Sequence, residues 1–142
     1  MRLGPALHRG IFVSLGYICA VVAATFVTVA ALAATRFGTG DFAAGILYGL
    51  VITFPTALPG FILALCIAIA LKLRNWVFFS LAGAFNVFPA TLVLELVIGG
   101  SPPGSLLREL PYYCLPGGLL GGLTFWLVAY RSVDAWPKEA RA

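Results

Sequence analysis

Five polar residues in the middle of this chain have side chains that could bind a solute or move a proton. Their hydroxyl and amide groups can hold a small molecule by hydrogen bonds, and a carboxylate can also exchange a proton. All of them lie within otherwise apolar stretches of sequence. We treat them as a candidate polar pocket: Thr53, Thr56, Asn86, Thr91 and Glu95.

Glu95 is the only acid inside an apolar stretch. A carboxylate within a membrane is a functional candidate, because placing a charged side chain in the bilayer costs free energy and such residues are rare without a function. A straight helix starting at Arg74, however, carries Glu95 about 31 Å away. That distance places it at the outer membrane interface, where it would serve as a hydrated anchor or pair with Arg108. Both interpretations stay open.

The sequence predicts no catalytic, cofactor or metal site. The single histidine, His8, lies in the charged N-terminal segment. Cys19, Cys66 and Cys114 are far apart and lack metal-ligand spacing, so they are expected to act as small apolar residues. The chain carries no nucleophile-elbow, zinc-protease or phosphate-binding motif. We therefore expect a protein that is not an enzyme.

The composition indicates that these polar residues lie in a membrane-embedded protein. The chain has 142 residues, of which 61% are hydrophobic and only 10% are charged. A soluble domain has about 25% charged residues. The mean hydropathy of +1.02 points the same way, so the lipid bilayer is the expected partner of most of the surface. Basic residues are scattered with no stripe or reading motif, which argues against binding of nucleic acid.

Four apolar stretches are long enough to cross a hydrocarbon core about 30 Å thick, which takes about 20 helical residues. They cover residues 11–34, 43–71, 76–98 and 113–130. We predict an all-α, up-down-up-down bundle of four transmembrane helices in a single domain spanning residues 1–142. The first stretch resembles a secretory signal, but it is longer than the 7–15 apolar residues of a signal core, which favours a retained helix.

Basic residues predict the orientation, because they are enriched on the cytoplasmic side. The first and third connections hold only Arg36 and Arg108. With seven basic residues on the opposite side, both termini are predicted to be cytoplasmic. These seven are Arg2, Arg9, Lys72, Arg74, Arg131, Lys138 and Arg141.

The segment TFPTALPG, residues 53–60, places Pro55 and Pro59 inside the second helix. Proline removes a backbone donor and displaces the carbonyl four residues earlier. We expect a kink that absorbs the surplus length of this helix, with the Thr53 and Thr56 hydroxyls satisfying the freed carbonyls. The alternative is a broken helix whose unwound backbone lines a cavity, as in transporters.

Two further prolines occupy the same predicted depth. Pro59 and Pro116 each lie 15 residues before an arginine, and Pro89 lies 15 residues after one. All three therefore fall about 22 Å from the inner boundary. The repeated LPG at residues 58–60 and 115–117 hints at two helical hairpins in parallel orientation.

Glycine pairs with GxxxG spacing occur in the second and fourth helices. Such spacing lets two backbones approach closely, and packing of this kind drives association in membranes. We expect these two helices to pack on each other, or either of them to face another subunit or a second copy of the chain. The residues are Gly45, Gly49, Gly117, Gly118, Gly121 and Gly122.

Two segments, PTALPGFILALCIAIALKLRNWVFF and GGLLGGLTFWLVAYRS, resemble small four-helix inner-membrane proteins of proteobacteria that have no assigned function. The resemblance covers about half of the chain. It implies the architecture and a bacterial inner membrane, and it implies no activity. The first helix lacks the deep glutamate of small multidrug exporters, and the polar motifs of fluoride channels are absent.

Two functional hypotheses follow. The first is a non-catalytic accessory or assembly subunit of a membrane complex, because the chain has glycine-rich faces, short loops and no site chemistry. The alternative is a small oligomeric channel or transporter that uses the polar layer in the outer half of the bilayer.

Overall fold

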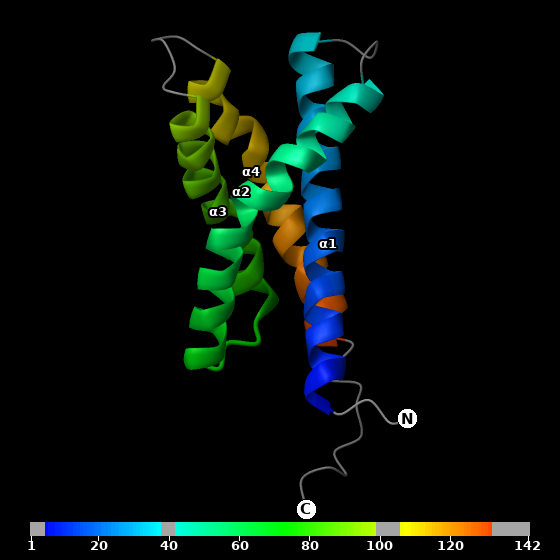
Figure 1. Ribbon diagram of the computed structural model, residues 1–142, viewed down its shortest axis with the longest axis vertical. Helices are drawn as coiled ribbons and strands as arrows, with labels where there is room; N and C mark the ends of the chain where they lie inside the picture. The colour runs from blue at the N-terminus through cyan, green and yellow to red at the C-terminus, as the bar shows by residue number, and fades with distance from the viewer. Residues whose placement is uncertain (1–4, 38–41, 99–105, 132–142) are drawn as a thin grey trace, which may run out of the picture.

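Four long helices pack as a bundle in the computed structural model, which describes residues 5–37, 42–98 and 106–131 (Figure 1). They are α1 (Pro5–Leu32), α2 (Phe42–Ala70), α3 (Trp76–Ile98) and α4 (Leu106–Phe125), and they run alternately up and down. Each contains a segment long and apolar enough to cross a membrane. The chain is therefore a small polytopic membrane protein with four candidate transmembrane helices, as the sequence predicts.

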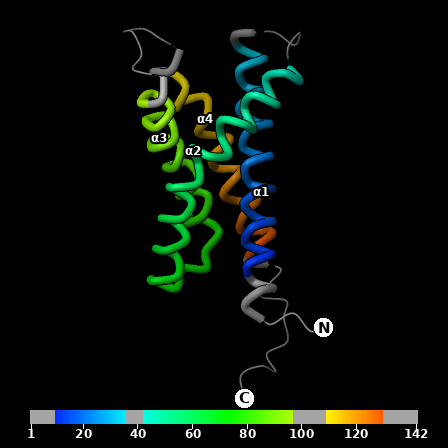
Figure 2. The backbone as a smooth tube through the Cα atoms, viewed as in Figure 1, coloured from blue at the N-terminus to red at the C-terminus, as the bar shows by residue number. Residues whose placement is uncertain are grey.

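Both chain ends of the bundle lie on one side. The start of α1, the end of α4 and the α2–α3 connection occupy the same end (Figure 2). π-Helical turns extend α1 over Ala33–Phe37 and α4 over Trp126–Arg131. The excess of basic residues at this end predicts that it faces the cytoplasm. Three of the basic residues used for this prediction, Arg2, Lys138 and Arg141, lie outside the described residues.

α2 ends in a defined backbone motif. Lys72 adopts a left-handed conformation with φ of 52°. The amide of Leu73 donates to the Ala68 carbonyl at 2.9 Å, and that of Lys72 to the Ile69 carbonyl at 3.3 Å. These two bonds form a Schellman motif, which satisfies carbonyls that the helix end would leave open.

The short connection to α3 is anchored at two further points. The Asn75 side chain accepts a hydrogen bond from the amide of Val77 at 3.3 Å and so caps α3. The indole of Trp126, beyond α4, donates to the carbonyl of Arg74 at 2.9 Å. The end of the fourth helix is thereby attached to the turn between the second and third.

α2 is helical through both of its prolines, and it changes direction midway, where Pro55 and Pro59 lie (Figure 1). The sequence left open a broken helix with unwound backbone. The structure instead keeps Phe42–Ala70 as one helix. Pro89 in α3 and Pro116 in α4 are likewise enclosed in continuous helices.

Glycines bring α4 into close backbone contact with both of its main neighbours. A Cβ at Gly83 of α3 would overlap the Gly118 carbonyl, and one at Gly122 would overlap the Phe79 carbonyl. On another face of α4, a Cβ at Gly121 would lie 2.9 Å from the Ala20 carbonyl of α1. Side chains at these positions would push the helices apart.

The glycine partners differ from the α2–α4 pairing that the sequence suggested. Gly117 and Gly121 face α1, whereas Gly118 faces α3. On α2, a Cβ at Gly45 would meet Val29 at 3.2 Å, and one at Gly49 would meet Thr25 at 2.7 Å. The α2 pair therefore packs on α1. These contacts all lie within one chain.

The buried core is concentrated at the end of the bundle where α1 begins and α4 ends. Phe79, Phe125, Ala68 and Ala129 form one cluster there, and each is at most 4% exposed. Ala68 is the one residue of α2 that is buried. α2 therefore contributes less to the core than α4, which packs closely on both α1 and α3.

α4 begins earlier than the sequence predicts. We expected the fourth helix to begin at residue 113, but α4 starts at Leu106 and includes Pro111. Pro111 is the sixth residue of α4, so it removes one intrahelical hydrogen bond, to Leu107, without ending the helix. The two hairpins suggested by the LPG repeat also pack differently, since α3 and α4 lie much closer together than α1 and α2.

Candidate ligand cavity

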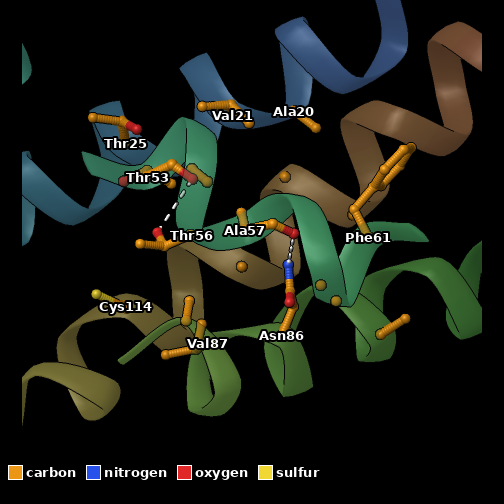
Figure 3. A pocket seen from close by; sticks show the side chains of 18 of the residues that line it. Ala20, Val21, Thr25, Thr53, Thr56, Ala57, Phe61, Asn86, Val87 and Cys114 are labelled. Carbon is orange, nitrogen blue, oxygen red and sulfur yellow. Dashed lines mark hydrogen bonds between the residues drawn. The ribbon is translucent and has the colours of Figure 1, made fainter. Parts of the chain in front are cut away.

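A cavity of about 180 Å³ that is partly open to the outside lies between the helices, and all four helices contribute to its wall (Figure 3). It runs beside the bend of α2, where Thr53, Thr56, Ala57 and Gly60 face it. Small and apolar side chains from the other helices make up most of the remaining wall. The cavity is thus a mainly apolar space with a few polar groups, which is the usual composition of a small-molecule site.

Four of the five polar residues singled out from the sequence line this cavity, namely Thr53, Thr56, Asn86 and Thr91. Glu95 is half-buried in the last turns of α3 and is not part of the wall. Its suggested partner Arg108 has a side chain outside what the structure describes. The structure therefore gathers the hydroxyls and the amide and leaves the carboxylate out.

Backbone carbonyls at the bend of α2 receive side-chain donors from three helices. The Thr56 hydroxyl donates to the Ile52 carbonyl of its own helix at 2.8 Å. The Tyr17 hydroxyl of α1 donates to the Phe54 carbonyl at 2.6 Å.

Asn86 of α3 supplies the third donor, and its amide nitrogen lies 2.9 Å from the Ala57 carbonyl (Figure 3). We expected the Thr53 and Thr56 hydroxyls to satisfy the carbonyls freed by Pro55 and Pro59, which belong to Val51 and Pro55. The three bonds go instead to Ile52, Phe54 and Ala57. The donors from α1 and α3 were not foreseen, and they hold the bent helix on both sides.

Two other hydroxyls of the wall also have partners, one within its own helix and one on a neighbouring helix. The Thr91 hydroxyl lies 3.0 Å from the Val87 carbonyl and 2.9 Å from that of Phe88. The Thr28 hydroxyl is paired with the thiol of Cys114 across the α1–α4 contact. A bond to the preceding turn, as Thr91 makes, is common for threonine when no water is present.

Two buried polar atoms of the wall have no hydrogen-bond partner in the described part of the chain, and these are Thr25 Oγ1 and Asn86 Oδ1. Thr25 is only 2% exposed. The amide orientation of Asn86 is determined by its bond to Ala57, because the reverse orientation would set two oxygens against each other. Its Oδ1 lies over Gly60, where a Cβ would overlap it.

Aromatic side chains close the cavity toward the buried core. The ring centroids of Tyr17 and Phe61 lie 4.6 Å apart, those of Phe61 and Phe125 4.9 Å, and those of Phe79 and Phe125 5.4 Å. These four rings form an aromatic floor, with the tilted and edge-to-face geometries that stabilise aromatic pairs.

The wall contains no ionised side chain among the described residues. No three His, Cys, Asp or Glu side chains lie together in the same part of the chain, so it offers no metal-binding cluster. An ion in this apolar space would lack a counter-charge, and its desolvation would be costly. The arrangement can therefore hold a neutral molecule by apolar contact and one or two hydrogen bonds.

Neither Tyr17 nor Cys114 was expected at the site from the sequence. Tyr17 lies in the first helix among apolar residues, and Cys114 resembled a small apolar residue. The sequence did hold one indication that the first helix contributes polar groups to the site. Thr25 and Thr28 lie in its outer half, at about the predicted depth of the other polar residues.

Comparison of the chain with models of protein families, with curated proteins and with solved structures finds no match. The geometry of the cavity is accordingly the main guide to function.

Proposed function

We propose that this protein binds a small neutral solute inside its four-helix bundle and carries it through the membrane, as a compact channel or transporter. The observation that supports this proposal is the cavity of about 180 Å³ walled by all four helices at the bend of α2. Sites between the helices of a bundle are a common location for ligands.

The accessory-subunit hypothesis rested on glycine-rich faces available for a partner. The glycines of α2 and α4 described above are engaged within the chain, so they no longer argue for a second protein. Purification in a mild detergent distinguishes the two hypotheses. We expect the chain to purify without a stoichiometric heterologous partner and to support solute flux in liposomes. A reproducible partner together with no flux would favour the accessory role.

The native cysteines allow a direct test of the cavity. Cys114 lines the wall, whereas Cys66 is exposed on the outside of α2. A benzyl thiosulfonate reagent should fill the cavity when coupled to a variant that retains only Cys114. Binding of a small probe such as fluorobenzene, followed by fluorine NMR in nanodiscs, should then be lost. The variant that retains only Cys66 is the matched control and should keep binding after the same treatment.

The proposal includes an orientation, with both termini in the cytoplasm of a bacterial cell and the protein in its inner membrane. The support is the excess of basic residues on the side of the termini. Reporter fusions at the C-terminus and within residues 99–105 should report cytoplasm and periplasm respectively. The opposite pattern would refute the charge argument.

A further inference from the structure

We propose that the solute bound in this cavity is a neutral molecule about the size of one aromatic ring that carries a hydroxyl or N–H group, and that Thr25 and Asn86 select it through that group. This inference rests on the proposed function, because it assumes that the cavity binds a solute. It adds the chemical class of the solute and the residues that distinguish it from a purely apolar molecule.

Size and charge set the first limits. An apolar protein cavity of about 150 Å³ accepts a benzene molecule. The cavity here, at about 180 Å³, accepts a single ring with one small substituent. Because its described wall carries no ionised side chain, the solute has to be uncharged.

The shape of the wall favours a flat molecule. Small alanine side chains line the cavity from three helices, among them Ala24 of α1, Ala64 of α2 and Ala82 of α3. The floor consists of the rings of Tyr17, Phe61, Phe79 and Phe125. A ring placed among them gains contact with small residues along its faces and with aromatic rings at its edge.

The unpartnered oxygens set the remaining requirement. A buried acceptor without a partner is unfavourable, so a ligand that supplies a donor is bound more tightly than an isostere that lacks one. The bond from the amide nitrogen to the Ala57 carbonyl identifies the unpartnered atom of Asn86 as the oxygen Oδ1, which can only accept a hydrogen bond. Thr25 Oγ1 can accept or donate. Both atoms are covered, so binding includes a side-chain rotation, which is common when ligands bind.

Three other hydroxyls of the wall do not share this property. Those of Tyr17, Thr56 and Thr91 already bond to backbone carbonyls. The matched control for Thr25 lies outside the wall. Thr124 of α4 has the same side chain, and its hydroxyl donates to the Leu120 carbonyl at 2.8 Å.

The test compares 4-fluorophenol with 4-fluorotoluene, which replaces the hydroxyl with a methyl group of similar size. Binding to the protein in nanodiscs is measured by fluorine NMR, with empty nanodiscs as the reference for partition into lipid. In the wild type we expect 4-fluorophenol to bind roughly fivefold more tightly, the effect of one net hydrogen bond. The preference should disappear in Thr25→Val/Asn86→Leu and persist in Thr124→Val.

The outcomes separate this inference from the proposed function. If neither compound binds, the cavity is not a solute site and both proposals fail. If both bind equally to the wild type, or if the double variant keeps the preference, the cavity binds solutes but Thr25 and Asn86 do not select them. Should the double variant misfold, Thr25→Val alone, which conserves shape, has to reduce the preference at least roughly twofold.

Discussion

At the scale of single residues, Tyr17 and Asn86 have the same task on opposite sides of α2. Each sends one donor across a helix contact to a carbonyl near the bend, at 2.6 Å for Tyr17 and 2.9 Å for Asn86. In a bilayer core no water replaces such a donor, so the bond stabilises the position of α2 as well as its backbone. Tyr17 also packs its ring on Phe54 and Phe61.

Tyr17→Phe removes the hydroxyl and keeps the ring. We expect it to lower the free energy of unfolding by about 0.6 kcal/mol, and by no more than about 1.7 kcal/mol, which is the range measured for hydrogen bonds between membrane helices. Steric-trapping measurements in bicelles would provide the value. Tyr48→Phe is the control, because Tyr48 is 69% exposed on α2 and its replacement should have no effect. An equal loss in both variants would contradict the role given to Tyr17.

At the scale of the element, the bend of α2 places its carbonyls where Tyr17 and Asn86 reach them. Pro55→Ala/Pro59→Ala restores two backbone donors and removes two ring clashes. We expect α2 to straighten and the cavity wall to lose its shape, so solute binding should fail although the protein still inserts. Spin labels at Tyr48 and Ile69, both exposed, report the change, since a straight helix separates these Cα atoms by about 32 Å.

The matched control for this experiment is Pro89→Ala in α3, which relieves a proline in a different helix of the same wall. The α2 label distance should not change in that variant. If the double α2 variant keeps both the wild-type distance and solute binding, the bend does not depend on its prolines.

The end of α2 offers a stabilising change. Lys72 holds a left-handed conformation that costs a residue with a Cβ about 1–2 kcal/mol, and glycine avoids this cost. After allowing for the greater freedom of glycine in the unfolded chain, we expect Lys72→Gly to raise the free energy of unfolding by about 1 kcal/mol. Lys72→Ala removes the same charge but keeps the strain, so it should bring no gain. A gain in both variants would assign the effect to the charge.

At the scale of the whole molecule, the four helices and their alternation follow from composition and the length of the apolar stretches. The rotation of each helix about its own axis, which decides the residues that face the other helices, does not follow from these properties. In a bilayer the lipid-facing side and the packed side are equally apolar, so the pattern that marks the buried face of a soluble helix is missing. This explains why Tyr17 and Cys114 were not assigned to the cavity, while Asn86 was found from its polarity.

The same limit applies to the glycines of α4. Their spacing marks them as packing residues, but it does not tell which helix they meet. Gly117 and Gly121 follow one face to α1, and Gly118 and Gly122 follow the adjacent face to α3. α4 lies between α1 and α3, and a spacing pattern within α4 does not show which of these helices each glycine contacts.

The close contact between α3 and α4 predicts a severe effect from a small change. In Gly122→Ala the new methyl group would overlap the Phe79 carbonyl and lie 2.9 Å from the Ser80 Cα, both backbone atoms that cannot turn away. We expect a loss of about 1–3 kcal/mol in the free energy of unfolding. Gly10→Ala is the control, since no described atom lies within 4 Å of its Cβ position. It should be neutral or slightly stabilising.

The contact between Gly83, Gly118 and Gly122 also has a consequence for how related sequences can diverge. Large residues such as Leu96 and Phe85, which are 74% and 67% exposed, can drift among apolar types because lipid accepts any of them. The three glycines have no such alternatives, as even alanine is too large. We therefore expect evolutionary constraint in this bundle to be strongest where the side chains are smallest.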